Sequence, residues 1–81
     1  MPAAIQDPRH QEVAALLANL RKERGWLQQE LAAKLRRTQT FVSKYESGLR
    51  RLDVLELLDI LKVLDADPHN FIDQISEMSK R

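Results

Sequence analysis

With 81 residues and no cysteine, the chain is expected to form one small domain, without disulfides or cysteine-based zinc sites. No apolar run approaches the ~20 residues of a membrane span, and the N-terminal sequence MPAAIQDPRH lacks the features of a secretory signal, so we expect a cytoplasmic protein without a membrane partner. The net charge of +1 is unevenly distributed, because residues 34–51 carry six bases and one acid whereas residues 52–81 carry three bases and seven acids. That basic segment indicates contact with a polyanion, although basic residues that merely solubilise the surface explain it equally well.

The first predicted helix follows a flexible N-terminus, which we place at residues 1–7. Asp7-Pro8 is a helix-start signal, since the carboxylate can cap the helix and proline at the first helical position loses no hydrogen bond. The helix reaches about Arg24 and ends before Gly25. Its apolar residues recur with helical spacing at Val13, Leu16, Leu17 and Leu20. We expect the folded domain to span residues 8–78 and residues 79–81 to be flexible.

Two short helices follow, at about residues 28–35 and 39–47, joined by the turn 36–38. Trp26 and Leu27 are apolar residues in the short connection that precedes them, so we expect both to pack rather than to act in function. Ala32 is small where two helices crossing at a steep angle must approach closely. Thr38 is expected to cap the second of the two helices, and Gly48 to end it.

The fourth predicted helix, residues 54–64, is unusually apolar, and Asp53 is expected to cap it. Apolar residues cover well over half of its circumference, which predicts burial on several sides through a central position, an intermolecular contact, or both. Asp67-Pro68 repeats the helix-start signal, and the fifth helix carries Phe71, Ile72 and Ile75 on one stripe.

The residue types needed for catalysis or for a cofactor are missing or scattered. The two glycines both lie at helix ends, so no glycine-rich phosphate loop can form. His10 and His69 stand alone near helix starts, which favours surface roles over metal binding. No nucleophile is paired with a base. We therefore expect no enzyme activity, no metal and no cofactor.

The helix at 39–47 has two unlike faces. Phe41, Val42 and Tyr45 point one way, and the opposite face carries small or polar side chains, at Gln39, Thr40, Ser43, Lys44 and Ser47. Glutamine can bond an adenine edge at two points, and threonine offers a hydroxyl and a methyl group to a base. An ordinary polar surface helix is the alternative, and these residues alone do not exclude it.

Residues 17–72 resemble the Cro/Xre family, the phage-repressor type of helix-turn-helix protein. The resemblance lies in Gly25 before the run Gln28-Gln29-Glu30-Leu31-Ala32, in Thr38-Gln39-Thr40 at the next helix start, in Val42 and Tyr45, and in Glu46-Ser47-Gly48 at its end. It implies an all-α, compact five-helix lambda-repressor-like DNA-binding domain with the helix-turn-helix at the second and third helices.

The resemblance also implies residue roles. Gln39, Thr40, Ser43 and Lys44 match base-reading or groove-facing positions. Contacts to the DNA backbone are implied or expected for a second set, comprising Gln28, Arg36, Arg37, Thr38, Arg50 and Arg51. Arg21 and Glu46 match a pair that forms a partly buried ion pair, which makes Glu46 structural rather than catalytic.

The chain departs from the family pattern at two positions. Leu27 stands where the family usually has a serine or threonine cap, and Arg36 stands where it usually has glycine. A non-glycine residue with positive φ costs about 1 kcal/mol, so Arg36 either tolerates that strain or the turn differs. An arginine there would also lie close to the DNA backbone.

The resulting expectation is a sequence-specific regulator of transcription that binds double-stranded DNA as a homodimer. Repression by occupancy of a near-palindromic operator is the outcome the family implies. The apolar excess of the fourth helix and the stripe Phe71, Ile72 and Ile75 suggest the dimer interface. Two alternatives remain: an antitoxin that binds a toxin partner as well as DNA, and a protein-interaction module without DNA binding.

Overall fold

The computed structural model describes residues 7–79, which form five helices and no strand. They are α1 (Pro8–Glu23), α2 (Gln28–Leu35), α3 (Gln39–Glu46), α4 (Val54–Val63) and α5 (Pro68–Ser79). The predicted all-α, five-helix fold is confirmed. Most of both expected flexible ends lies outside the described residues, but Asp7 caps α1 and Ser79 is the last residue of α5.

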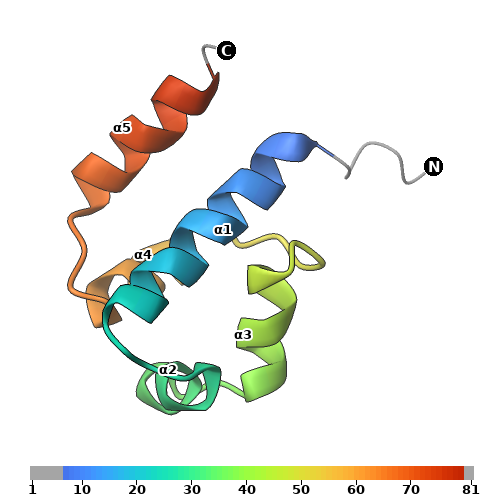
Figure 1. The fold of residues 1–81 in the computed structure, drawn as a ribbon, viewed down its shortest axis with the longest axis vertical. Coiled ribbons are helices and arrows are strands. Elements are labelled where there is room, and N and C mark those ends of the chain that lie inside the picture. Colours follow the sequence, from blue (N-terminus) through green and yellow to red (C-terminus); the bar gives the residue numbers. More distant parts are fainter. Residues whose placement is uncertain (1–6, 80–81) are drawn as a thin grey trace.

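The helices are arranged so that α2 and α3 lie together at one end of the molecule (Figure 1). Helix α1 crosses the middle and contacts both α3 and α5, and α4 contacts both α2 and α5. The helix-turn-helix is therefore supported by α1 and α4, while α5 closes the opposite end.

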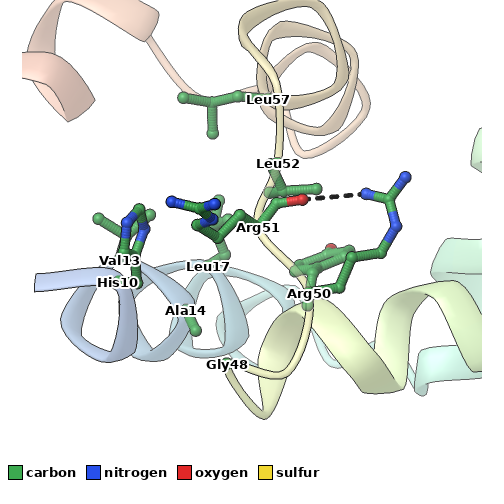
Figure 2. A pocket seen from close by; sticks show the side chains of 10 residues that line it. His10, Val13, Ala14, Leu17, Gly48, Arg50, Arg51, Leu52 and Leu57 are labelled. Carbon is green, nitrogen blue, oxygen red and sulfur yellow. Dashed lines mark hydrogen bonds between the residues drawn. The ribbon is translucent and has the colours of Figure 1, made fainter. Parts of the chain in front are cut away.

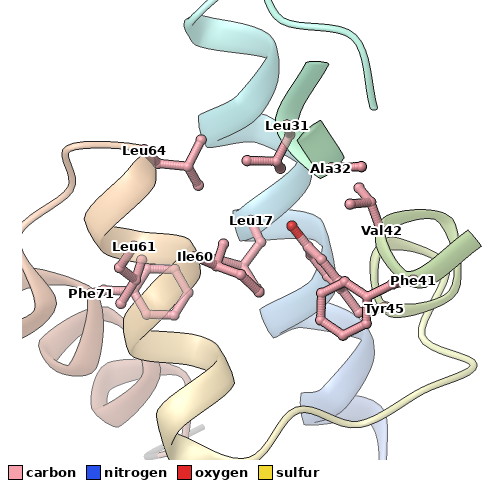
Figure 3. Close-up of a cluster of buried hydrophobic side chains, with 10 residues drawn as sticks. All are labelled: Leu17, Leu31, Ala32, Phe41, Val42, Tyr45, Ile60, Leu61, Leu64 and Phe71. Carbon is pink, nitrogen blue, oxygen red and sulfur yellow. The ribbon is translucent and has the colours of Figure 1, made fainter. Parts of the chain in front are cut away.

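One core joins all five helices (Figure 3). Leu17 of α1 meets residues of α2 and α3, and Ile60 and Leu61 of α4 continue the core towards Phe71 of α5. The rings of Phe41 and Tyr45 pack edge to face with their centroids 5.3 Å apart. The apolar face predicted for residues 41, 42 and 45 thus forms much of this core. Because that face is buried, the opposite face of α3 is directed towards solvent.

Each of helices α1 to α4 is followed, within two residues of its end, by a residue in the left-handed region. These residues are Gly25, Arg36, Gly48 and Asp65, with φ of 75°, 58°, 83° and 56°. After each, a backbone N–H bonds a carbonyl five residues earlier, for example Arg37 N to Ala32 O at 2.9 Å. Of the two alternatives left open for Arg36, a strained positive φ and a different turn, the structure has the positive φ. The positive φ of Asp65 was not predicted, because no glycine or asparagine marks that end of α4.

The start of α2 differs from the other helix starts. Thr38 and Asp53 each accept a hydrogen bond from the backbone of their helix, as predicted. Leu27 has no side-chain acceptor, so only the reciprocal bond exists, from Leu27 N to Glu30 Oε1 at 2.7 Å. Trp26 packs against the core, but the expectation that Leu27 packs was wrong, since it is 63% exposed.

Helix α4 was expected to be buried on several sides through a central position, an intermolecular contact, or both. The central position was wrong, and the intermolecular contact stays a prediction. Ile60 and Leu61 are buried, whereas Val54, Leu55 and Leu58 are exposed. Helices α2 and α5 pack against α4, and no other part of residues 7–79 covers its remaining face. The helix therefore lies at the edge of the fold. An apolar surface therefore stays open along α4.

Candidate nucleic-acid interface

The two faces of α3 are separated in the structure as the sequence indicates. Gln39, Thr40, Ser43 and Lys44 are all exposed. Their side chains carry hydroxyl, amide and ammonium groups, which are the donors and acceptors that base edges and phosphates require. Thr38 Oγ1 accepts a hydrogen bond from Phe41 N at 3.1 Å, so the start of α3 is ordered where the first two of these residues stand.

Arg21 and Glu46 form a bidentate ion pair that joins α1 to the end of α3. Arg21 Nε and Nη2 donate to the two carboxylate oxygens at 2.8 and 3.0 Å, and Nη1 donates to Trp26 O at 2.6 Å. Gln28 Nε2 donates to Glu46 Oε1 at 3.0 Å. The hydrogen bonds to Glu46 raise the pKa of the Arg21 guanidinium. The carboxylate of Glu46 thus links α1, α2 and α3 and fixes their relative positions.

The turn between α2 and α3 contains two arginines whose side chains have different surroundings. Arg36 is exposed in the left-handed conformation, with φ of 58° and ψ of 40°. The Arg37 guanidinium lies over the ring of Phe41, 3.8 Å from its centroid, and Nη1 lies 3.5 Å from Glu56 Oε2. Both cations therefore border the start of α3, where phosphate contacts are expected.

The loop between α3 and α4 points its two arginines in opposite directions (Figure 2). Arg51 extends towards His10 of α1, and together they line a pocket whose floor is apolar. The Arg50 side chain turns the other way, with Nη1 donating to Arg51 O at 3.2 Å. Sequence reasoning placed both arginines on the DNA backbone, whereas only Arg50 lies beside the Phe41 ring near α3.

Sequence reasoning missed Glu56, whose carboxylate receives both Nη1 and Nη2 of Arg50 at 2.9 Å. The same side chain accepts from Asp53 N at 3.1 Å and completes the cap of α4. Hydrogen bonds from Arg50 lower the Glu56 pKa to about 2. The spacing of Asp53 and Glu56 marks a capping box, but it does not reveal the arginine partners.

The three residues assigned to a dimer interface lie in different surroundings. Phe71 is 3% exposed inside the core, which leaves it little surface for a partner. Ile75 is partly buried against the core, whereas Ile72 is 51% exposed. Ile72 and Leu58 line a common hollow between α4 and α5. The large apolar side chains exposed on α4 and α5 are therefore Val54, Leu55, Leu58 and Ile72.

Among residues 7–79, no group of three or more histidine, cysteine, aspartate or glutamate side chains is arranged to hold a metal ion. None of the helices in this range combines the length and apolar character that crossing a membrane requires.

Comparisons with known proteins agree with this geometry. A family model described as helix-turn-helix matches residues 17–70. An XRE-family-like protein from Pseudomonas syringae pv. tomato is 39% identical, with a TM-score of 0.83 over 94% of this chain and 93% of that one. The restriction-modification controller protein C.Esp1396I, solved as a tetramer with its natural 35 base-pair operator, is 25% identical, with a TM-score of 0.79 over 89% and 95% of the two chains. No match was found among proteins of curated function.

The family match covers all of α2, α3 and α4 together with the second half of α1 and the start of α5. In helix-turn-helix proteins the second helix of the motif, here α3, is the one that enters the DNA major groove. The chain belongs to the Cro/C1-type (Xre) family of helix-turn-helix proteins, and it is a DNA-binding regulator of transcription.

Proposed function

We propose that the chain represses transcription as a homodimer on a near-palindromic operator, with α3 of each subunit in the major groove. The observation that carries the base-reading role is the exposed face of Gln39, Thr40, Ser43 and Lys44, which lies opposite the core face of α3. Arg36 and neighbouring cations flank that face and supply phosphate contacts. Repression then follows from occupancy of the promoter.

The homodimer is supported by the open apolar surface of α4 and α5. Leu55, Leu58 and Ile72 are 72%, 41% and 51% exposed. Burying such side chains against a second copy is favourable, at roughly 25 cal/mol per Å² of apolar surface. A dimer also places two α3 helices ~34 Å apart, one turn of DNA, so that two half-sites are read together. The C.Esp1396I structure, a tetramer on its operator, shows self-association in a structural neighbour.

Base reading is tested by selecting bound sites from randomised duplexes and then comparing two glutamine variants. Gln39→Ala should lose ~1–3 kcal/mol of binding free energy on the selected site while binding to random DNA stays nearly constant. Gln74→Ala, on the exposed surface of α5, is the matched control and should bind both DNAs as the wild type does. Equal losses on selected and random DNA for Gln39→Ala would contradict base reading.

The dimer is tested by sedimentation with two leucine variants. Leu58→Ser removes an apolar side chain from the proposed interface and should shift the protein towards monomer at micromolar concentration. Leu49→Ser removes a leucine that is 81% exposed in the loop before α4, and it should leave the dimer intact. A wild-type protein that stays monomeric with and without DNA would refute the homodimer.

Repression itself is tested with a reporter whose promoter contains the selected site. The wild-type protein should lower transcription, and Gln39→Ala should restore most of it. Unchanged or increased transcription at saturating protein would exclude simple repression by occupancy.

A further inference from the structure

Two of the cations expected at the DNA backbone share one carboxylate. Arg50 Nη1 and Nη2 each lie 2.9 Å from a Glu56 oxygen, and Arg37 Nη1 lies 3.5 Å from Oε2. Both guanidinium groups also lie over the ring of Phe41, at 3.8 and 4.9 Å from its centroid. The Glu56 side chain is 16% exposed, whereas those of Arg37 and Arg50 are 42% and 38% exposed. The arginines therefore cover the carboxylate and keep an outer edge in solvent.

The hydrogen-bond inventory of Arg50 shows what remains for a phosphate. Its Nη1 group bonds Glu56 and the Arg51 carbonyl, and its Nη2 group bonds Glu56 once. Since a guanidinium has five N–H donors, Nε–H and one Nη2–H are left without a hydrogen-bond partner within residues 7–79. These two donors form a fork on one edge of the group. A phosphate can occupy that fork without displacing Glu56. The two anions then lie on adjacent edges of one cation, which share Nη2, and repel each other.

We propose that Glu56 is an internal counter-ion of Arg37 and Arg50 that lowers the affinity of this protein for DNA of any sequence. Phosphate contacts carry no sequence information. Weakening them lowers occupancy everywhere, so only sites with enough base contacts stay bound. Glu56 thus sets the affinity threshold above which a sequence is recognised. The inference depends on DNA binding, which the family shows, and is independent of dimerisation and repression.

Glu56 performs this role across the neutral pH range. Its pKa is lowered to about 2, chiefly by hydrogen bonds from Arg50. The carboxylate is therefore ionised wherever the protein is folded near neutral pH, and the effect on DNA affinity is constant rather than switched by pH.

The decisive variant is Glu56→Gln, measured on a random-sequence duplex below the melting temperature found by circular dichroism. Glutamine keeps the length of the side chain and an oxygen that accepts from Asp53 N, so the cap of α4 is retained. The affinity should rise at least about threefold, because an anion is removed within a few ångströms of the phosphate contacts. The slope of log K against log salt should steepen by up to about one unit per subunit.

Asp73→Asn is the matched control, since it removes one negative charge from the exposed surface of α5. Asp73 borders the hollow of Leu58 and Ile72, so sedimentation must first verify that the variant associates as the wild type does. It should change the salt slope far less than Glu56→Gln. The double variant Arg50→Gln/Glu56→Gln should lose most of the gain, because the released cation is absent. Weaker DNA binding by Glu56→Gln would overturn the proposal and make Glu56 a positioning residue. An equal gain in Asp73→Asn would also overturn it, since net charge alone would explain both.

Discussion

Breaking the pair of Arg21 and Glu46 is the most direct test of how α3 is held. Their side chains are 10% and 6% exposed, so water reaches neither charge well. Arg21→Met removes the two bonds to the carboxylate and the bond to Trp26 O. The carboxylate then keeps Gln28 as its described partner. Leaving one charge of a buried pair without its counter-ion costs about 3–5 kcal/mol, a large part of the roughly 5–15 kcal/mol that stabilises a domain.

Thermal unfolding followed by circular dichroism measures this loss. One kcal/mol lowers Tm by about 4–8 °C in a domain of this size, so Arg21→Met should melt at least about 12 °C below the wild type. The double variant Arg21→Met/Glu46→Leu should recover much of the loss, because an apolar pair can replace a buried ion pair at little cost. The coupling energy of the pair is the loss in the double variant minus the losses in Arg21→Met and in Glu46→Leu measured singly.

A surface pair provides the control for this cycle. Arg9 and Asp7 form an ion pair at 2.6 Å, but the Arg9 side chain is 58% exposed. Solvent screens such a pair, so Arg9→Met should shift Tm far less than Arg21→Met. Strictly additive losses in Arg21→Met and Glu46→Leu, or a loss in Arg21→Met as small as that of Arg9→Met, would refute the reasoning.

Three further outcomes are expected. Arg36→Gly should raise the free energy of unfolding by about 0.5–1 kcal/mol, because glycine relieves the strain of φ at 58°; the same variant should bind random DNA less tightly, and urea unfolding with a mobility-shift assay measures both. Tyr45→Phe should stabilise the fold by about 1 kcal/mol, since the buried Tyr45 hydroxyl has no hydrogen-bond partner among the described residues and burial raises its pKa, and a melting point below that of the wild type would contradict this. The stability that ionised Glu56 contributes should be fully present above pH 4.5 and lost as the pH falls towards 2, because its folded pKa is lowered from 4.5 to about 2; unfolding curves of wild type and Glu56→Gln should therefore converge over that range.

The helices were predictable because their signals are local. Asp7-Pro8, Thr38 and Gly48 mark boundaries through caps and a left-handed stop, and each needs only its neighbours in sequence. The left-handed end of α4 at Asp65 was not predicted, because aspartate tolerates that conformation without requiring it.

Burial was less predictable than helix position. Leu58 and Leu61 look alike in sequence, yet Leu61 is buried in the core and Leu58 is 41% exposed. The difference arises from where α2 and α5 pack against α4, and apolar periodicity does not specify this. Phe71 was assigned to a dimer interface for the same reason, and it lies in the protomer core.

In the candidate DNA interface, too, the features with a local signal were predictable and the long-range contacts were not. The polar face of α3 follows from helical geometry, because the apolar positions 41, 42 and 45 fix the opposite side. Contacts over longer separations were not accessible, and the link from Arg50 to Glu56 connects a loop to a helix start that periodicity treats separately. Arg50 and Arg51 are adjacent in sequence but point to opposite sides of the loop, which no local pattern distinguishes.

The shortness of α3 has a consequence for the phenotypes that core mutations should produce. Its 8 residues are too few to persist as an isolated helix in water. The surface proposed to read DNA therefore exists only while the core beneath it is folded. Core substitutions that touch no DNA should then appear in cells as heat-sensitive regulatory alleles, with normal control at low temperature and loss of control on warming. Second-site changes that stabilise the core, rather than changes on the DNA face, should rescue them.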